Sequence, residues 1–588
     1  MSGTSFDAPR GRDHQGRPGT RRPPALLALV LAAALLLSGC AGDAGDEQAA
    51  EPSGAELEDR VPLEQLVPER DDQPPADDDE PSGEVDEPAG EVDEPAPAPP
   101  ELPPPPASRA LVEAEAASLL AGLLERRDGE QVAVLVVDEH GRELVAHDAD
   151  VPVLPASTLK IVTAAAALVT FGPEARFTTR VEATAPVDHD GVVRGDLVLI
   201  GTGDPVLATP EYGRWIYPVR PRTPFEDLAE QLAAHGVRRV EGDVVGVVER
   251  FDGPPTASGW PDRYFNDFDA RFADGLAVDA GVRTIVTYPE PDPEEAAEDG
   301  EVAEDGEAAE DGEAAEDGEA AEVDAEDEDE DEREPTGPPI VRIEHTRNPA
   351  EHAVAELIRL LDEHDIEVAG EGRVGEPVGA SVGRLAAVAS PPLREILTFA
   401  VQRSDNQVTD AVFRAVGRQR TGTGSFVSGE RALLQVIEQL GITTEGLVFA
   451  DGSGLSRDDR ATARMLVELD RAMHASRHAT VWTSLMAVMG ESGTLRSRLP
   501  NSVATGRFVG KTGTLRDVAA LSGAVVGDDG RRYHLAVIAN ANGQARWLSR
   551  TFVDELIVLL AADVRGCDVL TASGGDGALG RPPVAVRC

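Results

Sequence analysis

The chain has 588 residues and a formal net charge of −55, and 41% of its residues are hydrophobic. This length predicts two to four domains. Most of the charge lies in residues 41–107 and 290–335, with net charges of −20 and −25, so the rest of the chain is only mildly acidic. Clustered basic residues, which a nucleic-acid-binding surface needs, are not indicated. The three cysteines do not indicate a disulfide scaffold.

Residues 1–40 predict an export signal. Basic residues precede an apolar stretch from Ala25 to Leu37, which suits a signal peptide and is too short to span a bilayer. The segment ends in Leu37-Ser38-Gly39-Cys40, which resembles the bacterial lipobox. The sequence therefore predicts lipid attachment at Cys40 and a place at the outer face of the bacterial cytoplasmic membrane or in the cell wall. An ordinary secretory signal with an incidental cysteine is the alternative.

Two acidic segments have too few apolar residues to form a core. Residues 41–107 are rich in proline, and like charges and prolines favour an extended chain. We predict a disordered linker that separates a folded domain from the membrane, with a cation-binding or partner-binding arm as the alternative. Residues 290–335 repeat Ala-Glu-Asp-Gly-Glu-Ala with a period of six, which predicts a disordered loop. Weak Ca²⁺ binding is the alternative there.

Regular structure is expected from residue 108 onwards. Apolar periodicity predicts a helix at 111–124, a hairpin from 131–138 and 143–148, a buried helix at 159–171, and a β-rich region at about 178–260. After the acidic repeat, the pattern predicts a strand at 340–344 and helices at 350–362, 393–401, 410–416, 461–473 and 479–489. Three strands at 508–514, 518–526 and 532–539 and a helix at 546–561 follow.

The buried helix at 159–171 begins beside a serine and a lysine. Ser157 and Lys160 are three residues apart, so they can share one helix face. Lys160 is the only charge in a run that is apolar almost all round, which marks a buried helix. Burial lowers the pKa of a lysine, and a neutral amine can take the proton of a neighbouring hydroxyl.

Lysine is rare in this chain. Among 53 basic residues, only Lys160 and Lys511 are lysines. A preference for arginine explains why lysines are scarce, but not where the two remaining ones stand. Arginine cannot deprotonate in proteins, whereas the pKa of lysine shifts readily. We infer that arginine cannot replace lysine at these two positions.

Both lysines belong to motifs that stand in one order along the chain. Ser157-Thr158-Leu159-Lys160, Ser404-Asp405-Asn406 and Lys511-Thr512-Gly513 together are typical of the serine penicillin-recognising enzymes. Each motif alone is a weak signal.

The motifs suggest a division of roles. Ser157 is the predicted nucleophile and Lys160 its base, while Ser404 relays a proton beside the positive charge of Lys511. Asn406 would hold a substrate peptide bond. Backbone N–H groups near Ser157 and on the strand after Lys511 could form an oxyanion hole. Thr512 and Thr514 suit a substrate carboxylate, and Gly513 permits close approach.

Over roughly residues 108–565 the chain resembles the D-alanyl-D-alanine carboxypeptidase/endopeptidase family of low-molecular-mass penicillin-binding proteins. Ser157 and Ser404 lie 247 positions apart, a spacing too long for a compact β-lactamase. Further motifs that carry the resemblance begin at Gly195, Asp451, Ser492 and Gly510. The resemblance implies an α+β transpeptidase fold like that of serine β-lactamases and penicillin-binding proteins, an antiparallel sheet flanked by helices, with β-rich domains inserted between the first two motifs.

The implied organisation has two catalytic segments, residues 108–180 and 386–565. The insert spans residues 181–385, and a tail spans residues 566–588. The implied function is hydrolysis of D-Ala-D-Ala or D-Ala-diaminopimelate bonds in peptidoglycan peptides, without a cofactor or metal, and with β-lactams as covalent inhibitors. A β-lactamase and a non-catalytic penicillin-binding wall scaffold are the alternatives. The sequence does not decide between carboxypeptidase and endopeptidase.

Two further pairs of residues leave questions open. Cys567 and Cys588 could form a disulfide in an exported protein or stay free. His474 and His478 lie four apart on a predicted helix and could share a metal, but no third ligand is evident from the sequence.

Overall fold

The computed structural model describes residues 109–588 except 127–129, 217, 219, 249–250, 267–268, 273, 288–338, 542, 571–576, 578 and 580–582. The predicted export signal with Cys40, the linker at 41–107 and the acidic repeat at 290–335 lie outside the described residues. Among the described helices, none is both long and apolar enough to cross a membrane.

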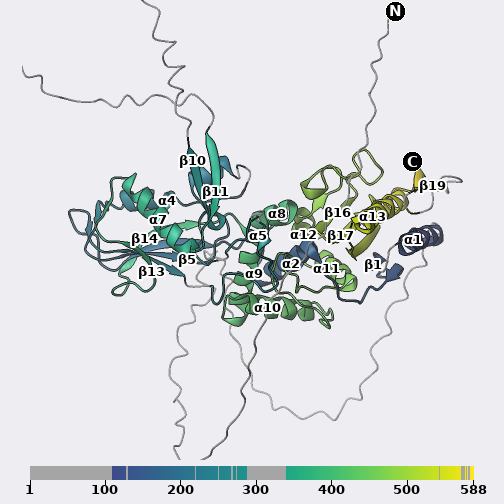
Figure 1. Ribbon diagram of the computed structural model, residues 1–588, viewed down its shortest axis with the longest axis horizontal. Helices are drawn as coiled ribbons and strands as arrows, with labels where there is room; N and C mark the ends of the chain where they lie inside the picture. Colours follow the sequence, from purple (N-terminus) through teal and green to yellow (C-terminus); the bar gives the residue numbers. More distant parts are fainter. Residues whose placement is uncertain are drawn as a thin grey trace, which may run out of the picture. The chain divides into compact units, whose positions relative to one another are not determined.

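The catalytic segments share an antiparallel six-stranded sheet (Figure 1). In spatial order its strands are β15 (Ala487–Val488), β16 (Phe508–Leu515), β17 (Val518–Val526), β18 (Arg532–Asn540), β1 (Gln131–Asp138) and β2 (Glu143–His147). The N-terminal hairpin therefore completes a sheet whose other strands come from the C-terminal part of the chain. Nearly every residue of β17 and β18 is buried, because helices cover both faces.

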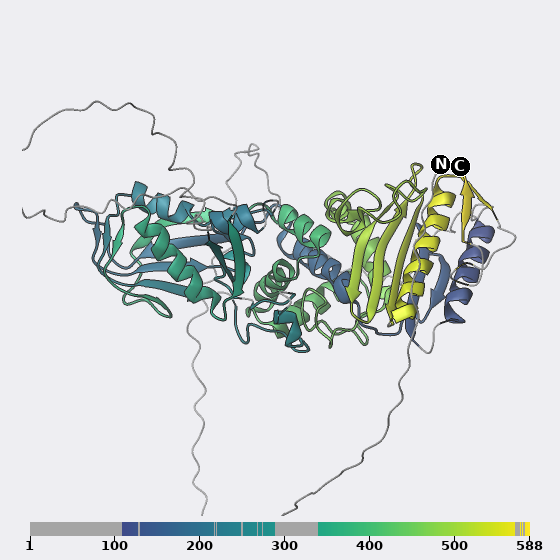
Figure 2. The same ribbon diagram turned by 45° about the horizontal axis from the view of Figure 1, so that its top comes forward.

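The two faces of this sheet have separate cores. Val134 and Val136 of β1 face α1 (Arg109–Leu124) and α13 (Gly543–Val564), which pack on each other. In Figure 2 the yellow α13 and the dark blue α1 lie together on one side of the yellow-green strands. Ala133 and Leu135 belong to the other core, since alternate residues of a strand point to opposite faces.

The second core is built mainly by the following helices. They are α2 (Lys160–Phe171), α8 (Leu393–Arg403), α9 (Asn406–Thr421), α10 (Phe426–Gln439), α11 (Ala463–Ala475) and α12 (Ala479–Leu485). α2 is surrounded by α8, α9, α10 and α11, and all its residues from Lys160 to Leu168 are buried. A single turn of 3-10 helix, η2 (Ala156–Leu159), leads directly into it.

The chain between the first two motifs folds around a mixed five-stranded sheet. Its order is β13 (Gly372–Val374), β9 (Val244–Val248), β5 (Leu197–Gly201), β3 (Thr178–Ala183) and β14 (Gly383–Ala389). A smaller parallel sheet contains β12 (Glu367–Val368), β8 (Arg239–Val240) and β4 (Val192–Val193). Both sheets share one hydrophobic core with α4 (Asp227–Ala234) and α7 (Pro349–Asp362), to which residues such as Leu228 and Leu357 contribute.

Shorter elements complete the described chain. They are β6 (Leu207–Ala208), α3 (Pro210–Trp215), β7 (Thr223–Pro224), α5 (Arg263–Asn266), η3 (Asp279–Gly281), β10 (Val282–Thr287), β11 (Ile340–His345), η4 (Gly493–Leu495), β19 (Asp568–Leu570) and β20 (Ala585–Arg587). Cys567 and Cys588 form a disulfide, which answers the question that the sequence left open.

Most predicted elements are confirmed to within a few residues, but the helix predicted at 479–489 is too long. It ends at Leu485, because Ala487 and Val488 pair with Gly510 and Val509 at the edge of the sheet. The region predicted to be β-rich at about 178–260 also contains the helix α4, which was not predicted, whereas α7 confirms the helix predicted at 350–362. The domain boundaries at 180 and 385 stay predictions.

Deletion of residues 293–334 is expected to leave acylation by penicillin unchanged. β10 and β11 pair in continuous register from Val282 with His345 to Thr287 with Ile340, so their ends already lie side by side. The residues that remain can close this hairpin. The acylation rate and the melting temperature of the deletion variant would be compared with those of the full chain; slower acylation would mean that the acidic repeat supports the catalytic fold.

Candidate active site

All five predicted catalytic residues meet between α2, the α8–α9 junction and β16. Lys160 Nζ lies 3.1 Å from Ser157 Oγ and 2.7 Å from Asn406 Oδ1. Lys511 Nζ lies 3.0 Å from Ser404 Oγ. Ser404 and Asn406 are two residues apart, so the α8–α9 junction connects both lysines. The three motifs thus form one site.

Ser157 is held on the turn η2, not on the α-helix proper. Ala156 before it has a positive φ of 48°, an uncommon conformation for a residue with a side chain. β16 passes close to this turn: a Cβ atom at Gly513 would lie only 2.8 Å from the carbonyl oxygen of Pro155. Glycine is needed at this point because the strand and the turn that carries Ser157 touch.

The junction between α8 and α9 places Ser404 and Asn406. Ser404 adopts the left-handed conformation (φ 60°, ψ 39°) at the end of α8. Asp405 caps the next helix, because its Oδ1 accepts the N–H of Val408 at 2.9 Å. Asp405 therefore has a structural role. As the N-cap it starts α9 immediately after the turn, so that Asn406 is the first residue of that helix.

The amine of Lys160 is fully buried and has three oxygen neighbours. Besides Ser157 and Asn406, the carbonyl oxygen of Ser453 lies 2.6 Å from Nζ. Burial lowers the pKa of Lys160 to about 8, although the carboxylates of Asp410 and Asp451 oppose this shift. A neutral amine has two N–H groups and one lone pair. If it donates to Asn406 and Ser453, the lone pair remains for the hydroxyl proton of Ser157.

Buried acids shape the loop that supplies the Ser453 carbonyl. Asp451 accepts the backbone N–H groups of Ser453 at 2.9 Å and Gly454 at 2.6 Å, while Asp410 accepts that of Gly452 at 2.9 Å. Burial is the main cause that raises the pKa of Asp410 well above its usual value. Sequence reasoning did not single out Asp410. The available signal was an acid within a stretch of α9 that is otherwise mostly apolar.

Lys511 and the strand that carries it border the site on the other side. Burial, together with the charge of Lys160, lowers the pKa of Lys511. In the described part of the chain, β15 pairs only with Val509 and Gly510, so β16 from Lys511 onwards has no neighbouring strand on that edge. An open strand edge can pair with an extended peptide. Thr512 is half-buried and Thr514 is exposed, so both are accessible there.

Comparison with known proteins identifies the family of this chain. Residues 115–561 match the D-Ala-D-Ala carboxypeptidase 3 (S13) family. The chain belongs to this family. A D-alanyl-D-alanine carboxypeptidase of Actinomadura sp. (strain R39) is 31% identical over 496 residues, covering 77% of this chain and 87% of the relative. Carboxypeptidase DacB of Mycolicibacterium smegmatis is 29% identical over 79% of this chain and 85% of its own length.

Solved structures support the fold class. Penicillin-binding protein 4 of Haemophilus influenzae matches with a TM-score of 0.59 and 20% identity, over 76% of this chain and 99% of that chain. The predicted α+β fold of penicillin-binding proteins is thereby confirmed. As an S13 family member, the chain is a serine peptidase of the D-Ala-D-Ala carboxypeptidase class, which confirms the predicted enzyme class.

In this S13 enzyme, the insert contacts the catalytic motifs directly. Asn406 Nδ2 donates to the carbonyl oxygen of Asp269 at 2.8 Å, and Arg220 donates to Oε1 of Gln407 at 2.9 Å. Trp260 donates its ring N–H to Asp451 at 2.7 Å. Sequence reasoning missed all three contacts, because each joins residues more than 130 positions apart and no local pattern marks them.

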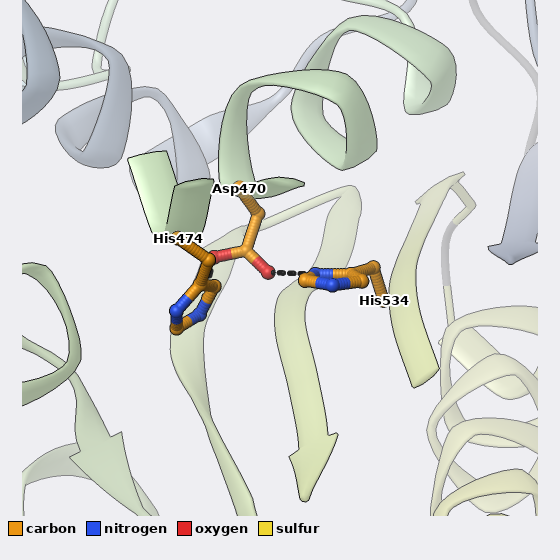
Figure 3. Close-up of side chains that lie close together, drawn as sticks. All are labelled: Asp470, His474 and His534. Atoms are coloured by element: carbon orange, nitrogen blue, oxygen red, sulfur yellow. Dashed lines mark hydrogen bonds and ion pairs between the residues drawn. The ribbon is translucent and has the colours of Figure 1, made fainter. Parts of the chain in front are cut away.

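The histidines that were considered as a metal pair do not lie together as expected. His474 lies beside Asp470 and His534 (Figure 3). His478 instead accepts a hydrogen bond from Arg477. His534 Nδ1 is 2.7 Å from Asp470 Oδ2, and Trp482 donates to the other oxygen at 2.8 Å. The Asp470 carboxylate is thus satisfied by N–H donors, which joins α11, α12 and β18 in the core.

His474 is expected to make the fold less stable in acid. Burial lowers its pKa from 6.5 to about 4, outweighing the nearby Asp470 carboxylate. Because the folded-state pKa is the lower one, protonation favours unfolding, and up to about 3 kcal/mol is lost as pH falls from 6.5 to 4. Urea unfolding of His474→Gln across this range should show a smaller loss than the original chain. His189→Gln, at an exposed histidine, is the control and should behave like the original chain. Equal pH dependence in all three proteins would contradict the prediction.

Proposed function

We propose that this chain hydrolyses D-Ala peptide bonds in peptidoglycan stem peptides through an acyl-enzyme on Ser157. One observation carries the proposal: the buried amine of Lys160, with a pKa near 8, lies 3.1 Å from the Ser157 hydroxyl. Its remaining hydrogen-bond partners leave one lone pair for the serine proton. A serine activated in this way is suited to acyl transfer.

In the proposed acylation step, Lys160 takes the proton of Ser157 while Oγ attacks the carbonyl carbon of the penultimate D-Ala. The backbone N–H of Ser157 and one from the open edge of β16 stabilise the oxyanion. Ser404 passes its proton to the leaving amine and is reprotonated with the proton that Lys160 took from Ser157, so the peptide C–N bond breaks, the acyl group stays on Ser157 and Lys160 is neutral again. Lys511 Nζ lies 3.0 Å from Ser404 Oγ and orients this hydroxyl.

Hydrolysis of the serine ester completes the reaction. Water attacks the acyl carbon, Lys160 accepts the proton of the water, and Ser157 leaves with its proton restored. Asn406 holds the substrate amide while its own Oδ1 accepts from Lys160 at 2.7 Å. Thr512 and Thr514 bind the C-terminal carboxylate of the substrate, and Gly513 lets the strand approach the acyl group. A β-lactam enters the same pathway and leaves a slowly hydrolysed ester.

The proposal extends to the location of the enzyme. Export, lipid attachment at Cys40 and an extended linker at residues 41–107 would place the catalytic segments outside the cytoplasmic membrane, where peptidoglycan lies. The family is one of cell-wall enzymes, which supports an extracytoplasmic site of action.

Replacement of Ser157 by alanine is expected to abolish covalent labelling by penicillin, because the attacking oxygen is gone. Residues 108–588 would be mixed with a labelled penicillin and examined by intact mass and peptide mapping. The original chain should carry a long-lived adduct on Ser157 and the variant none. An adduct on another residue would contradict the assignment, and rapid drug turnover by the original chain would indicate a β-lactamase.

Replacement of Lys160 by arginine is expected to slow acylation by about 10²- to 10⁴-fold, because a guanidinium cannot act as a base. In the original chain the acylation rate should increase as pH rises through about 8, since only the neutral amine can accept the serine proton. Stopped-flow or quenched acylation between pH 6 and 10 would measure both effects, with circular dichroism as the check of folding. An arginine variant that turns over substrate normally would contradict the role of deprotonation.

A further inference from the structure

A pocket of about 340 Å³ adjoins the strand of the third motif. Thr512, Gly513 and Thr514 form one wall, and the opposite side is formed by α13 and the segment that follows η4. Its other polar lining residues are Thr494, Ser497, Arg498, Ser549 and Arg550. The hydroxyls of Thr512 and Thr494 are hydrogen-bonded at 2.8 Å, so the two walls meet beside the proposed carboxylate site.

The charges around this pocket are positive. Among the described residues, no acidic side chain lines it and two arginines do. Arg498 is partly neutralised, because its Nε donates to Asp554 Oδ1 at 2.6 Å. Arg550 is exposed, and among the described residues its side chain has no hydrogen-bond or ion-pair partner. A guanidinium of this kind can bind a carboxylate through two parallel hydrogen bonds.

The position of the pocket relative to the scissile bond follows from the proposed function, on which this inference rests. Thr512 and Thr514 would hold the carboxylate of the leaving residue, and both also line the pocket. The pocket therefore lies on the leaving-group side. A leaving D-Ala has only a methyl side chain, which would leave the pocket unfilled. The leaving diaminopimelate of a cross-link has a long side chain that continues into a second stem peptide.

We propose that this pocket binds the second stem peptide of a cross-link, with Arg550 and, in a lesser part, Arg498 pairing with its carboxylates. The enzyme then recognises an anionic peptide as its leaving group, and its preferred substrate is a cross-linked pair of stem peptides. The bond that is broken and the acyl-enzyme that forms are the same as in the carboxypeptidase reaction. Only the group that leaves as an amine differs.

The test compares two substrates with one enzyme. Hydrolysis of a D-Ala-diaminopimelate cross-linked muropeptide dimer and of a monomeric pentapeptide would be followed by chromatography, and kcat/KM measured for each. Arg550→Ala is expected to lower the ratio of dimer to monomer kcat/KM by about tenfold, the effect of one lost charged hydrogen-bond pair. Arg550→Lys should restore part of that loss, because it keeps the charge but not the two-pronged geometry.

Arg431→Ala is the matched control. Arg431 is also an exposed helical arginine, on α10, with no side-chain partner among the described residues, and it does not line the pocket. Its replacement should leave the ratio unchanged. The proposal would be overturned if Arg550→Ala and Arg431→Ala gave the same ratio, or if the original chain cleaved the monomer and not the dimer. Failure of the proposed function itself is distinguishable, because neither substrate would be cleaved and penicillin would not label Ser157.

Discussion

The site depends on a lysine amine kept away from water. An ammonium group in an apolar interior is costly, so burial favours the neutral form of Lys160. The fold could have cancelled this effect with a carboxylate in direct contact. Instead it provides an amide oxygen, a backbone carbonyl and the serine hydroxyl, which together satisfy a neutral amine. Asp410 and Asp459 lie behind this shell. Burial raises the pKa of both, which weakens the attraction that they exert on the charged form.

This constraint also accounts for the distribution of lysine and arginine along the chain. Arginine serves in ion pairs, such as Arg457 with Asp517 and Arg464 with Asp150, and in hydrogen bonds to neutral groups, such as that of Arg220 with Gln407. The two lysines are both fully buried. The amine of Lys160 lies beside Ser157, and that of Lys511 lies beside Ser404. A planar guanidinium would neither release a proton nor fit beside a single hydroxyl at these positions. Composition and structure thus identify the same two residues for the same physical reason.

Much of the fold and of the site could be predicted from the sequence, because short-range patterns determine them. The apolar run after Ser157 predicted the buried helix α2, and short β-rich runs predicted the main strands of the large sheet. The three motifs indicated the five predicted catalytic residues that the structure brings together. By contrast, α10 was missed although its N-terminus has a capping box at Ser425 and Ser428. The short strand β15 could not be foreseen, since it exists only through pairing with β16.

The predictions that failed or were missing concern contacts between distant segments. His474 was considered with His478, but its neighbours are Asp470, four residues earlier on α11, and His534, which a strand 60 residues later supplies. Periodicity within one helix cannot reveal a partner on another element. For the same reason, the role of the buried acids around the Ser453 carbonyl could not be predicted. Asp410 on α9 and Asp451 both accept backbone N–H groups of one loop, and sequence patterns do not show that these two segments meet.

The insert between the first two motifs contacts the candidate active site directly. The 247 positions that separate Ser157 from Ser404 are therefore compatible with a single site. The side chain of Asn406 has one oxygen and one amide nitrogen. Its oxygen accepts from Lys160, and its nitrogen donates to the backbone of Asp269 in the insert. That second bond fixes the orientation of the amide, since a flipped amide would present N–H to the lysine. The buried Arg220 holds the next residue, Gln407, in the same way. Residues of the insert therefore determine which atom of Asn406 faces Lys160, and through it the direction in which the lone pair of the amine points.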